Sequence, residues 1–518
     1  MEDKNFTIYK SSAGSGKTFT LVKEYLALAL NDAAKPPQSY KHILAVTFTN
    51  KAAAEMKERI IKALKELAED DYSTISSGTR TMLAALKEHK KLNAVKKVDD
   101  VTIRMRSKNI LTAILHNYSD FAIGTIDSFV QKVVRTFAFD LKIPMSFDIE
   151  MDDDKLLTQA IDLLLAQIGN DEKLTKALIE FTESKTDEEK SWHIENDLKL
   201  FAKNLLTEEG SVYIDKLKNL TIDDFFGIKD SLTIELKKFE IFINSCGNEG
   251  LEIIKRGGVE HEKFAGGANG IGKYFTYLFE IRIDKLTPTA TVQKNIDSEN
   301  WYSGKASKDD KASIDAIAGA LKNIFTKATE YVEKYKSEYI VFSLINKNIY
   351  SLAVLNEIEK LLNEYKAENN ILHISEFNKM IAKIVMNEPI PFIYERLGEK
   401  YNNYLIDEFQ DTSVLQFQNL LPLIDNSLAT GHFTMLVGDG KQAIYRWRGG
   451  EVEQFAMLPE IFKHNNNELV LERQKALIRN HNPEVLKNNF RSKREVIEFN
   501  NSLFRFLGNT LNEKSSSF

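Results

Sequence analysis

Residues 6–30 read FTIYKSSAGSGKTFTLVKEYLALAL. This stretch combines a short strand pattern, a loop of small residues and an amphipathic helix pattern, in the order that a phosphate-binding loop requires. Gly14 and Gly16 let backbone N–H groups turn toward a phosphate, and the N-terminus of the following helix adds its dipole. Lys17 can reach the outer phosphates, and the Thr18 hydroxyl can hold Mg²⁺. The stretch therefore predicts an α/β domain that binds a nucleotide.

A set of loop residues is expected to surround the phosphates: Ser12, Ala13, Gly14, Ser15, Gly16, Lys17 and Thr18. A second glycine-rich segment at residues 267–273, GANGIGK, has a similar spacing. Tyr274 stands there at the position of the Mg²⁺-binding hydroxyl, and no strand pattern precedes the segment. We therefore expect no nucleotide at residues 267–273. The surrounding glycine-dense patch, residues 246–273, is predicted to be a loop.

Beyond residue 30 the chain continues to alternate, with a strand pattern over residues 42–48 and a helix pattern over residues 50–68. This alternation predicts a parallel sheet. The middle of the chain carries helical apolar stripes instead, and strand patterns return near residues 401 and 432. The predicted domains are a sheet domain in two parts, residues 1–147 and 371–475, a helical insertion, residues 148–370, and the start of a second domain, residues 476–518.

Length, composition and charge exclude several classes of protein. The 518 residues exceed what one hydrophobic core usually supports, so two to four domains are expected. The net charge of −6 argues against a protein that coats nucleic acid by bulk electrostatics, so any contact with nucleic acid must be local. The single cysteine, Cys246, excludes an intramolecular disulfide and a cysteine-based zinc site. No apolar run or signal-peptide pattern indicates a membrane, and a cytoplasmic location is expected.

Residues 404–412, YLIDEFQDT, place paired carboxylates directly after an apolar strand pattern. Asp407 at the tip of the strand can bind Mg²⁺, and Glu408 can accept a proton from a water that attacks a phosphate. The alternative is a solvated turn, because acidic pairs are common at strand ends.

Residues 435–450, MLVGDGKQAIYRWRGG, combine a strand pattern, a Gly-Asp turn, a glutamine and an aromatic/arginine cluster. Gln442 can sense the γ-phosphate of a nucleoside triphosphate. Tyr445, Trp447 and Arg448 offer rings and a planar cation on which unpaired bases can stack, whatever their sequence. The alternative is that Trp447 is a core residue, but the neighbouring glycines and arginines favour a surface.

Taken in order, these segments resemble the superfamily 1 helicases of the UvrD/Rep/RecB group. SSAGSGKT is similar to motif I, TFTNKAAAEMKERI (residues 47–60) to motif Ia, and GTIDSF (residues 124–129) to the next strand-contact motif. IDEFQDT is similar to motif II, VGDGKQAIYRWRGG to motif III, and NFRS (residues 489–492) to motif IV. The resemblance implies a RecA-like P-loop domain (1A) interrupted by a mostly helical domain (1B), followed by the start of a second RecA-like domain (2A).

The resemblance also implies a function, which is ATP-driven movement along single-stranded DNA, usually 3′ to 5′, with ATP and Mg²⁺ as cofactors. The DNA would be a single strand or a duplex with a single-stranded end. The residues that would touch DNA are Thr47, Phe48, Asn50, Thr125, Ser128, Tyr445, Trp447 and Arg448. Phe490 would stack on adenine and Arg491 would approach the γ-phosphate. With Lys17, Asp407, Glu408 and Gln442, Arg491 completes the implied catalytic set.

Departures from the family pattern indicate a branch within it. Ser11 replaces the first glycine of the loop, and Phe19 stands near the adenine where plainer members often carry arginine. These changes and the large insertion are more similar to the RecB/AddA branch, which implies double-strand-break processing and a partner subunit of the AddB/RecC kind. Motifs V and VI are expected a few hundred residues beyond motif IV, so the chain is predicted to be an N-terminal fragment. Loss of an arginine finger can lower turnover by about 10³–10⁵.

Two other functions compete with an active motor. The first is a nucleotide-gated DNA-binding or scaffold subunit without an active motor, against which the intact carboxylates count. The second is a phosphate-loop kinase or GTPase, for which no guanine-reading NKxD element is present in a suitable place. That function would also leave the segment IYRWRGG without a role.

Overall fold

The structure is a computed structural model that describes residues 4–32, 37–92, 98–141, 143–144, 146–186, 194–385, 397, 400–464 and 467–515. The chain forms two compact units. Unit 1 comprises Met1–Met151, Leu206–Glu208 and Lys366–Phe518, and unit 2 comprises Asp152–Leu205 and Glu209–Tyr365.

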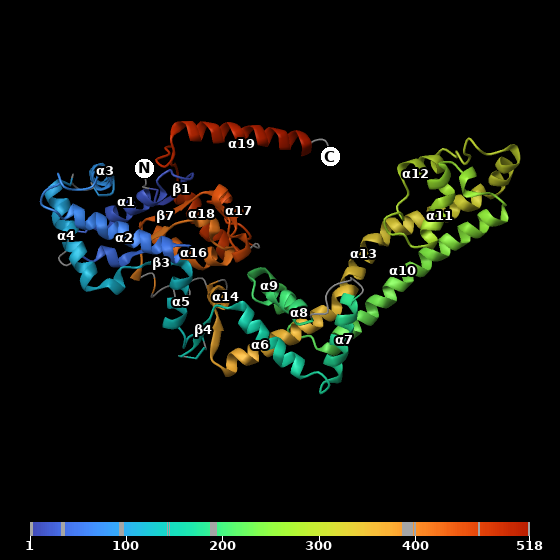
Figure 1. The fold of residues 1–518 in the computed structure, drawn as a ribbon, viewed down its shortest axis with the longest axis horizontal. Helices are drawn as coiled ribbons and strands as arrows, with labels where there is room; N and C mark the ends of the chain where they lie inside the picture. The colour runs from blue at the N-terminus through green and yellow to red at the C-terminus, as the bar shows by residue number, and fades with distance from the viewer. Residues whose placement is uncertain are drawn as a thin grey trace. The chain divides into compact units, whose positions relative to one another are not determined.

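A six-stranded sheet forms the centre of unit 1 (Figure 1). Its strands are β1 (Phe6–Lys10), β2 (Ile43–Thr47), β3 (Ile123–Thr125), β6 (Asn403–Ile406), β7 (Thr434–Gly438) and β8 (His481–Val485). They lie in the order β3-β2-β6-β7-β1-β8, and every neighbouring pair is parallel. The predicted α/β fold with a parallel sheet is therefore confirmed.

Helices cover both faces of this sheet because side chains of a strand alternate between its faces. Ala45, Leu405 and Met435 pack in one hydrophobic cluster with α1 (Lys17–Leu30), α2 (Asn50–Leu67), α3 (Ser77–Lys87) and α4 (Asp100–His116). On the other face, Leu44 and Ile406 pack with α5 (Ile126–Thr136), α14 (Ile374–Val385), α16 (Val414–Ala429), α17 (Val452–Met457) and α18 (Glu468–Asn480). Both faces are buried, as is usual for a parallel sheet.

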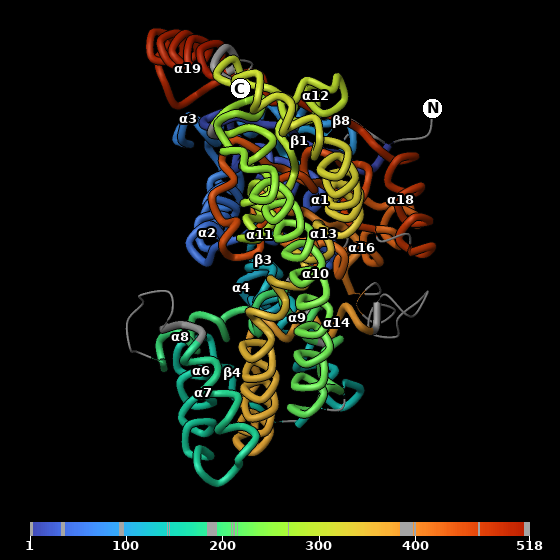
Figure 2. Tube along the Cα trace, turned by 90° about the vertical axis from the view of Figure 1, so that its right-hand side faces the viewer, coloured from blue at the N-terminus to red at the C-terminus, as the bar shows by residue number. Residues whose placement is uncertain are grey.

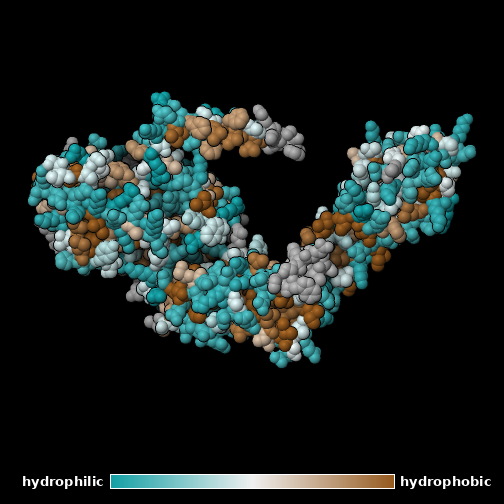
Figure 3. All heavy atoms as spheres, in the orientation of Figure 1, coloured by the Kyte–Doolittle hydropathy of each residue, from teal (hydrophilic) through white to brown (hydrophobic). Residues whose placement is uncertain are grey.

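The last strand of the sheet lies beyond the predicted boundary between the first and second domains. The sequence predicts a second domain over residues 476–518, but β8 pairs with β1 in the register Phe6↔His481 to Lys10↔Val485. Residues 481–485 thus belong to the first sheet. Beyond them lies α19 (Arg494–Ser515), whose apolar side chains are largely exposed, including Phe499 at 66% and Phe504 at 69% (Figure 3). The assignment of α19 to a second motor domain stays a prediction.

Unit 2 is helical, and its long helices α10 (Ile222–Arg256) and α13 (Lys308–Glu368) run side by side (Figures 1 and 2). Phe239 of α10 stacks on Tyr339 of α13 at 4.4 Å between ring centroids. The other helices of this region are α6 (Asp153–Ala166), α7 (Glu172–Thr186), α8 (Ile194–Ala202), α9 (Glu208–Leu217), α11 (Ile271–Phe279) and α12 (Ala290–Asp297). The flanking strands β4 (Asp148–Glu150) and β5 (Ile371–His373) pair with each other in unit 1.

The glycine-dense patch at residues 246–273 is a loop only in its middle, residues 257–270, where two short 3₁₀ turns lie, although its composition predicts a loop throughout. Its first part continues α10 to Arg256, and its last part begins α11. Gly247 and Gly250 lie where α10 and α11 cross, because a Cβ on either residue would approach Phe279 or Phe275 to within 2.2 Å. These two glycines therefore serve close helix packing.

Within the described residues, no helix is long and apolar enough to cross a membrane.

Candidate nucleotide and DNA site

The loop between β1 and α1 has the backbone that phosphate binding needs. Gly14 has φ +77° and Gly16 has φ +88°, which is the left-handed region where a side chain would be strained. Ser11, which stands at the usual first glycine, donates its hydroxyl to the Gly438 carbonyl at 2.7 Å. That bond fixes the loop to the end of β7. Serine at this position is thus accommodated by the neighbouring strand.

Lys17, the first residue of α1, meets two of the predicted catalytic residues. Its Nζ donates to Glu408 Oε2 at 3.0 Å and to Gln442 Oε1 at 3.2 Å. Gln442 in turn donates its Nε2 to Asp439 Oδ2 at 2.6 Å, so its amide is oriented with the oxygen toward the lysine. Three residues from distant segments therefore converge at the carboxyl edge of the sheet, where α/β proteins bind ligands.

Asp407 and Glu408 follow β6 and differ in environment. Asp407 is 6% exposed, and burial together with the neighbouring Glu408 carboxylate raises the pKa of Asp407 to about 7. Glu408 is half-buried and has φ +50°, which is unusual for a residue other than glycine. The pair is thus held in a defined geometry rather than in a solvated turn.

Asp407 and Thr18 offer the hard oxygen ligands that Mg²⁺ prefers. The salt bridge of Lys17 is made with Glu408 and not with Asp407, so Asp407 is not committed to that ammonium. The described residues contain no group of three or more His, Cys, Asp or Glu that could hold a metal by itself. The donor set therefore fits a Mg²⁺ ion that takes its remaining oxygens from nucleotide phosphates and water.

A buried glutamine that the sequence motifs did not single out connects these groups. Gln410 is 1% exposed, and its Nε2 donates to Glu408 Oε2 at 2.8 Å and to Asp411 Oδ2 at 3.0 Å. Its Oε1 accepts the Asp439 N–H at 2.9 Å. Asp411 Oδ1 accepts the Ile444 N–H at 3.3 Å. The sequence signal is a polar residue between two acids directly after a buried strand, since such a residue must be hydrogen-bonded when buried.

The aromatic and arginine residues of two distant segments form one cluster, which we name the aromatic cluster: Phe48, Tyr445, Trp447 and Arg448. Phe48 and Tyr445 have ring centroids 4.5 Å apart, and Tyr445 and Trp447 are 6.3 Å apart. The Arg448 guanidinium lies 5.6 Å from the Phe48 ring and 5.5 Å from the Trp447 ring. Trp447 is 78% exposed, so it is a surface residue and not part of the core.

The other residues that are predicted to contact DNA differ in their exposure to solvent. Thr47 is fully buried and Thr125 is 8% exposed, with the Thr125 hydroxyl accepting the Ser128 N–H at 3.1 Å as the cap of α5. Asn50 is exposed at the first turn of α2. Ser128 is exposed and donates its hydroxyl to the Thr125 carbonyl at 2.8 Å. Asn50 and Ser128 are therefore at least partly accessible, whereas the side chain of Thr47 is not.

The segment resembling motif IV docks on the phosphate loop. The Phe490 N–H donates to the Gly14 carbonyl at 2.8 Å, and Asn489 Nδ2 donates to the Ala13 carbonyl at 2.9 Å. The Phe490 ring is 77% exposed and lies beside Gly16, where a Cβ added to the glycine would be 3.6 Å from the ring. An exposed ring beside the loop is available for stacking on a base.

Three further predicted residues lie at or near the loop. Arg491 is exposed, and its Cβ would lie 2.6 Å from a Cβ on Gly14, so its backbone is close to the loop. Ser15 is buried, and its hydroxyl accepts the Ser12 N–H at 3.3 Å. Phe19 packs partly against the hydrophobic cluster of α1 to α4. The place of Phe19 near adenine stays a prediction.

The second glycine-rich segment lacks the features of the first. Residues 267–269 form a short 3₁₀ helix and Ile271–Phe279 form α11, without a preceding strand. Tyr274 is 2% exposed and donates its hydroxyl to the Leu286 carbonyl at 2.7 Å. Tyr274 is thus a core residue of unit 2.

The chain is similar to helicase/nuclease subunits of several bacteria. An ATP-dependent helicase/nuclease subunit of Listeria monocytogenes (strain HCC23) is 25% identical over 542 residues, and one of Lactococcus lactis subsp. cremoris (strain SK11) is 27% identical over 546 residues. The exonuclease/helicase subunit RexA of Lactococcus lactis subsp. cremoris (strain MG1363) is 26% identical over 543 residues. Each alignment covers 97% of this chain but 38% or 39% of the relative. The chain therefore spans about two fifths of the length of these relatives.

The family itself follows from a match over most of the chain. The UvrD/REP helicase N-terminal domain matches residues 3–463, a span that includes the phosphate loop, the paired carboxylates and the aromatic cluster. With the parallel sheet and the convergence of Lys17, Glu408 and Gln442 already established, this match shows that the chain belongs to the UvrD/REP helicase family.

Proposed function

We propose that this chain is the ATP-binding part of a DNA helicase or translocase that acts in DNA repair or recombination. The observation that carries the proposal is the convergence of Lys17 with Glu408 and Gln442, which lie 391 and 425 residues away in the chain. A lysine held between a carboxylate and an amide at a phosphate loop is poised to exchange these partners for the phosphates of ATP. The aromatic cluster supports DNA as the second ligand.

The positions of these residues support a proposed role for each of them in hydrolysis. When Lys17 turns to the β- and γ-phosphates, Glu408 is released to accept a proton from the water that attacks the γ-phosphorus. The bond between the γ-phosphorus and the bridging oxygen breaks, and ADP leaves with phosphate. Asp407 and Thr18 would hold Mg²⁺, which neutralises charge that develops on the phosphates. Gln442, bonded to Asp439, is placed to respond to the γ-phosphate.

The hydrogen bonds of Gln410 and Asp411 support coupling between the two ligands. Gln410 bonds Glu408 and Asp411, and Asp411 holds the backbone of Ile444, the residue before Tyr445. A change at Glu408 can therefore alter the position of the segment that carries the aromatic cluster. Such a connection suits a motor that must alternate between gripping and releasing a strand.

The decisive experiment measures ATP turnover of the whole protein that carries this chain, with and without single-stranded DNA. We expect stimulation by DNA and a loss of turnover of about 10²-fold or more in Lys17→Ala, because the lysine stabilises charge on the phosphates. The matched control is Lys273→Ala at the second glycine-rich segment, which should leave turnover unchanged. Turnover that ignores DNA, or equal loss in the two variants, would refute the proposal.

Two finer points extend the proposal. We infer 3′ to 5′ polarity from the family resemblance, and displacement of streptavidin from the 5′ but not the 3′ end of an oligonucleotide would support that direction.

We also infer a partner subunit of the AddB/RecC kind, because the relatives are named as subunits. The inferred partner is tested by purifying the whole protein from the cells that produce it naturally. A second subunit should co-purify in a fixed ratio, and recovery of the protein without any second subunit would contradict the inference.

A further inference from the structure

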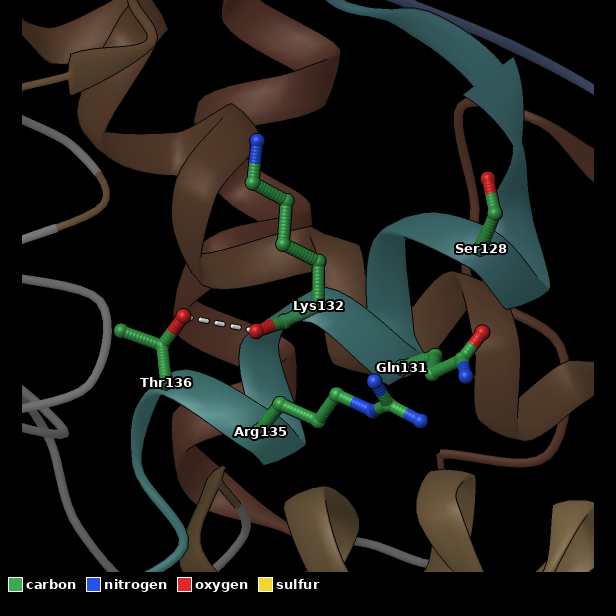
Figure 4. A pocket seen from close by; sticks show the side chains of 5 residues that line it. All are labelled: Ser128, Gln131, Lys132, Arg135 and Thr136. Atoms are coloured by element: carbon green, nitrogen blue, oxygen red, sulfur yellow. Dashed lines mark hydrogen bonds between the residues drawn. The ribbon is translucent and has the colours of Figure 1, made fainter. Parts of the chain in front are cut away.

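One face of α5 carries a polar stripe that begins at Ser128 of the GTIDSF motif and continues beyond the motif, to residues for which the sequence gave no role. Ser128, Gln131, Lys132, Arg135 and Thr136 line a cavity of about 370 Å³ (Figure 4), and we name this feature the α5 basic groove. A water molecule takes about 30 Å³ in the liquid, so the cavity has room for a larger group. The opposite face of α5 is buried through Phe129, Val130, Val133 and other apolar residues. The stripe is thus the solvent-facing side of an amphipathic helix.

The positive charges of the groove are not neutralised within the described part of the chain. Neither Lys132 nor Arg135 forms a salt bridge with a described residue, and Arg135 lies over the Phe147 ring at 5.7 Å. Burial and the nearby Lys400 lower the pKa of Lys132, while Asp120 acts in the opposite direction. Asp120 is itself paired with Lys41 at 3.2 Å. A local excess of positive charge in a chain of net charge −6 indicates an anionic ligand.

Some hydrogen-bond donors of the groove are bonded to backbone carbonyls, and others are available to a ligand. The Ser128 hydroxyl donates to the Thr125 carbonyl, and the Thr136 hydroxyl donates to the Lys132 carbonyl at 2.7 Å (Figure 4). These hydroxyl protons are therefore used within the helix. The ammonium of Lys132, the guanidinium of Arg135 and the amide of Gln131 remain the donors that face the cavity.

The groove begins next to the aromatic cluster. Asp127, the residue before Ser128, accepts a hydrogen bond from Gln416 Nε2 at 2.8 Å and interacts electrostatically with Arg448 of the cluster. From Ser128 to Thr136 the helix rises roughly 12 Å. Successive nucleotides of a B-form strand are roughly 3.4 Å apart along the axis, so the groove is long enough for at least two phosphates.

We propose that the α5 basic groove binds the phosphate backbone of single-stranded DNA, with Lys132 and Arg135 as the charged contacts and Gln131 as a neutral donor. The inference rests on the proposed function and adds a phosphate subsite to it. The aromatic cluster contacts bases, and the groove holds the backbone of the adjoining nucleotides. Phosphate contacts of this kind fix the position of a strand without reading its sequence.

The test measures equilibrium binding of fluorescent oligo(dT) and oligo(dA) to the whole protein at several salt concentrations, without nucleotide. Each phosphate contact with a single strand contributes about 0.7 to the slope of log K against log salt. We expect Lys132→Ala/Arg135→Ala to reduce the slope by roughly 1.4 and to weaken binding equally for both sequences. Lys132→Arg/Arg135→Lys, which keeps both charges, should restore most of the slope.

The matched control is Lys62→Ala/Lys65→Ala, which removes two charges at the same spacing from the exposed face of α2. This control should leave the slope unchanged. An unchanged slope in the α5 variant, with wild-type DNA binding present, overturns the groove but not the proposed function. Absence of DNA binding by the wild-type protein overturns the proposed function instead. A third experiment measures chemical modification of Lys132 in the presence of single-stranded DNA or of inorganic phosphate, at constant ionic strength. If phosphate protects Lys132 from modification and DNA does not, the groove binds a free anion and the proposal is overturned.

Discussion

Glu408 shows at the residue scale how the site is prepared for chemistry. Its φ of +50° places it in a region that costs a residue other than glycine of order 1–3 kcal/mol. The cost is met by bonds from Lys17 and Gln410 to the same carboxylate oxygen, Oε2. A strained residue held by several partners is typical of functional sites. We interpret the conformation as the one that aims the carboxylate at the phosphate loop.

Replacement of Glu408 by glutamine tests its role as the proton acceptor. Glu408→Gln keeps the size of the side chain and its hydrogen-bonding oxygen but cannot take a proton at neutral pH. We expect turnover to fall by about 10²–10⁴ while ATP binding is retained. The measurement is steady-state hydrolysis beside binding of a fluorescent ATP analogue. Loss of binding and turnover together would instead assign Glu408 a purely structural role.

Thr47 tests which residues of the motif Ia segment contact DNA. It is fully buried, and its hydroxyl has no hydrogen-bond partner among the described residues. Thr47→Val removes an unsatisfied polar group, so the free energy of unfolding should stay the same or rise by about 1 kcal/mol, and DNA affinity should not change. Phe48→Ala is the contrast, with an expected loss of about 1–3 kcal/mol in DNA binding. A drop of tenfold or more in the DNA affinity of Thr47→Val would show that the threonine contacts DNA, as the family resemblance implies.

At the scale of secondary-structure elements, the crossing of α10 and α11 explains the glycines whose density predicts a loop. Helix axes approach closely only where side chains at the contact are small. Gly247 and Gly250 meet this requirement, whereas Gly227 of the same helix has no atom within 4 Å of a Cβ position. Glycines within one helix therefore have different roles that depend on what packs against them.

This difference gives a matched pair of substitutions in α10. Gly250→Ala should lower the free energy of unfolding by about 1–3 kcal/mol, because the new methyl group overlaps the Phe275 ring. Gly227→Ala should raise it by up to about 1 kcal/mol, since alanine has the higher helix propensity and the position is open. Chemical denaturation of the two variants checks both signs. Equal effects in both variants would mean that helix propensity, not the crossing, decides the response.

At the scale of the whole molecule, the sheet of unit 1 joins segments from both ends of the sequence. β1 pairs with β7 and β8, and the helical unit 2 is inserted between β3 and β6 in the chain. Contacts between distant residues form slowly, because a long segment of chain must be closed before they stabilise the fold. The first sheet is therefore complete only when residue 485 is present.

Truncation tests this boundary. A chain that ends at residue 480 keeps α18 complete but loses β8, and with it five residue pairings with β1 and the contacts of Asn489 and Phe490 with the phosphate loop. We expect it to be less stable by about 2–5 kcal/mol than a chain that ends at residue 493, given about 0.5–1.5 kcal/mol for each hydrogen bond. Thermal unfolding of the two chains provides the comparison. Equal stability would restore the predicted domain boundary at residue 476.

The sequence alone determined the features that depend on neighbouring residues. The order of strand, glycine-rich loop and helix at residues 6–30 predicted the parallel α/β fold, and the motif wording predicted the family, because both are local patterns. The motif resemblance implies which distant residues share a site, and the tertiary structure shows the contacts that they make. Folding brought Lys17 to Glu408 and Gln442, placed Phe48 on Tyr445, buried Thr47 and made residues 481–485 the sixth strand. The physical reason is that adjacency across hundreds of residues is set by the order of strands in the sheet and by packing on its faces, which no local pattern encodes.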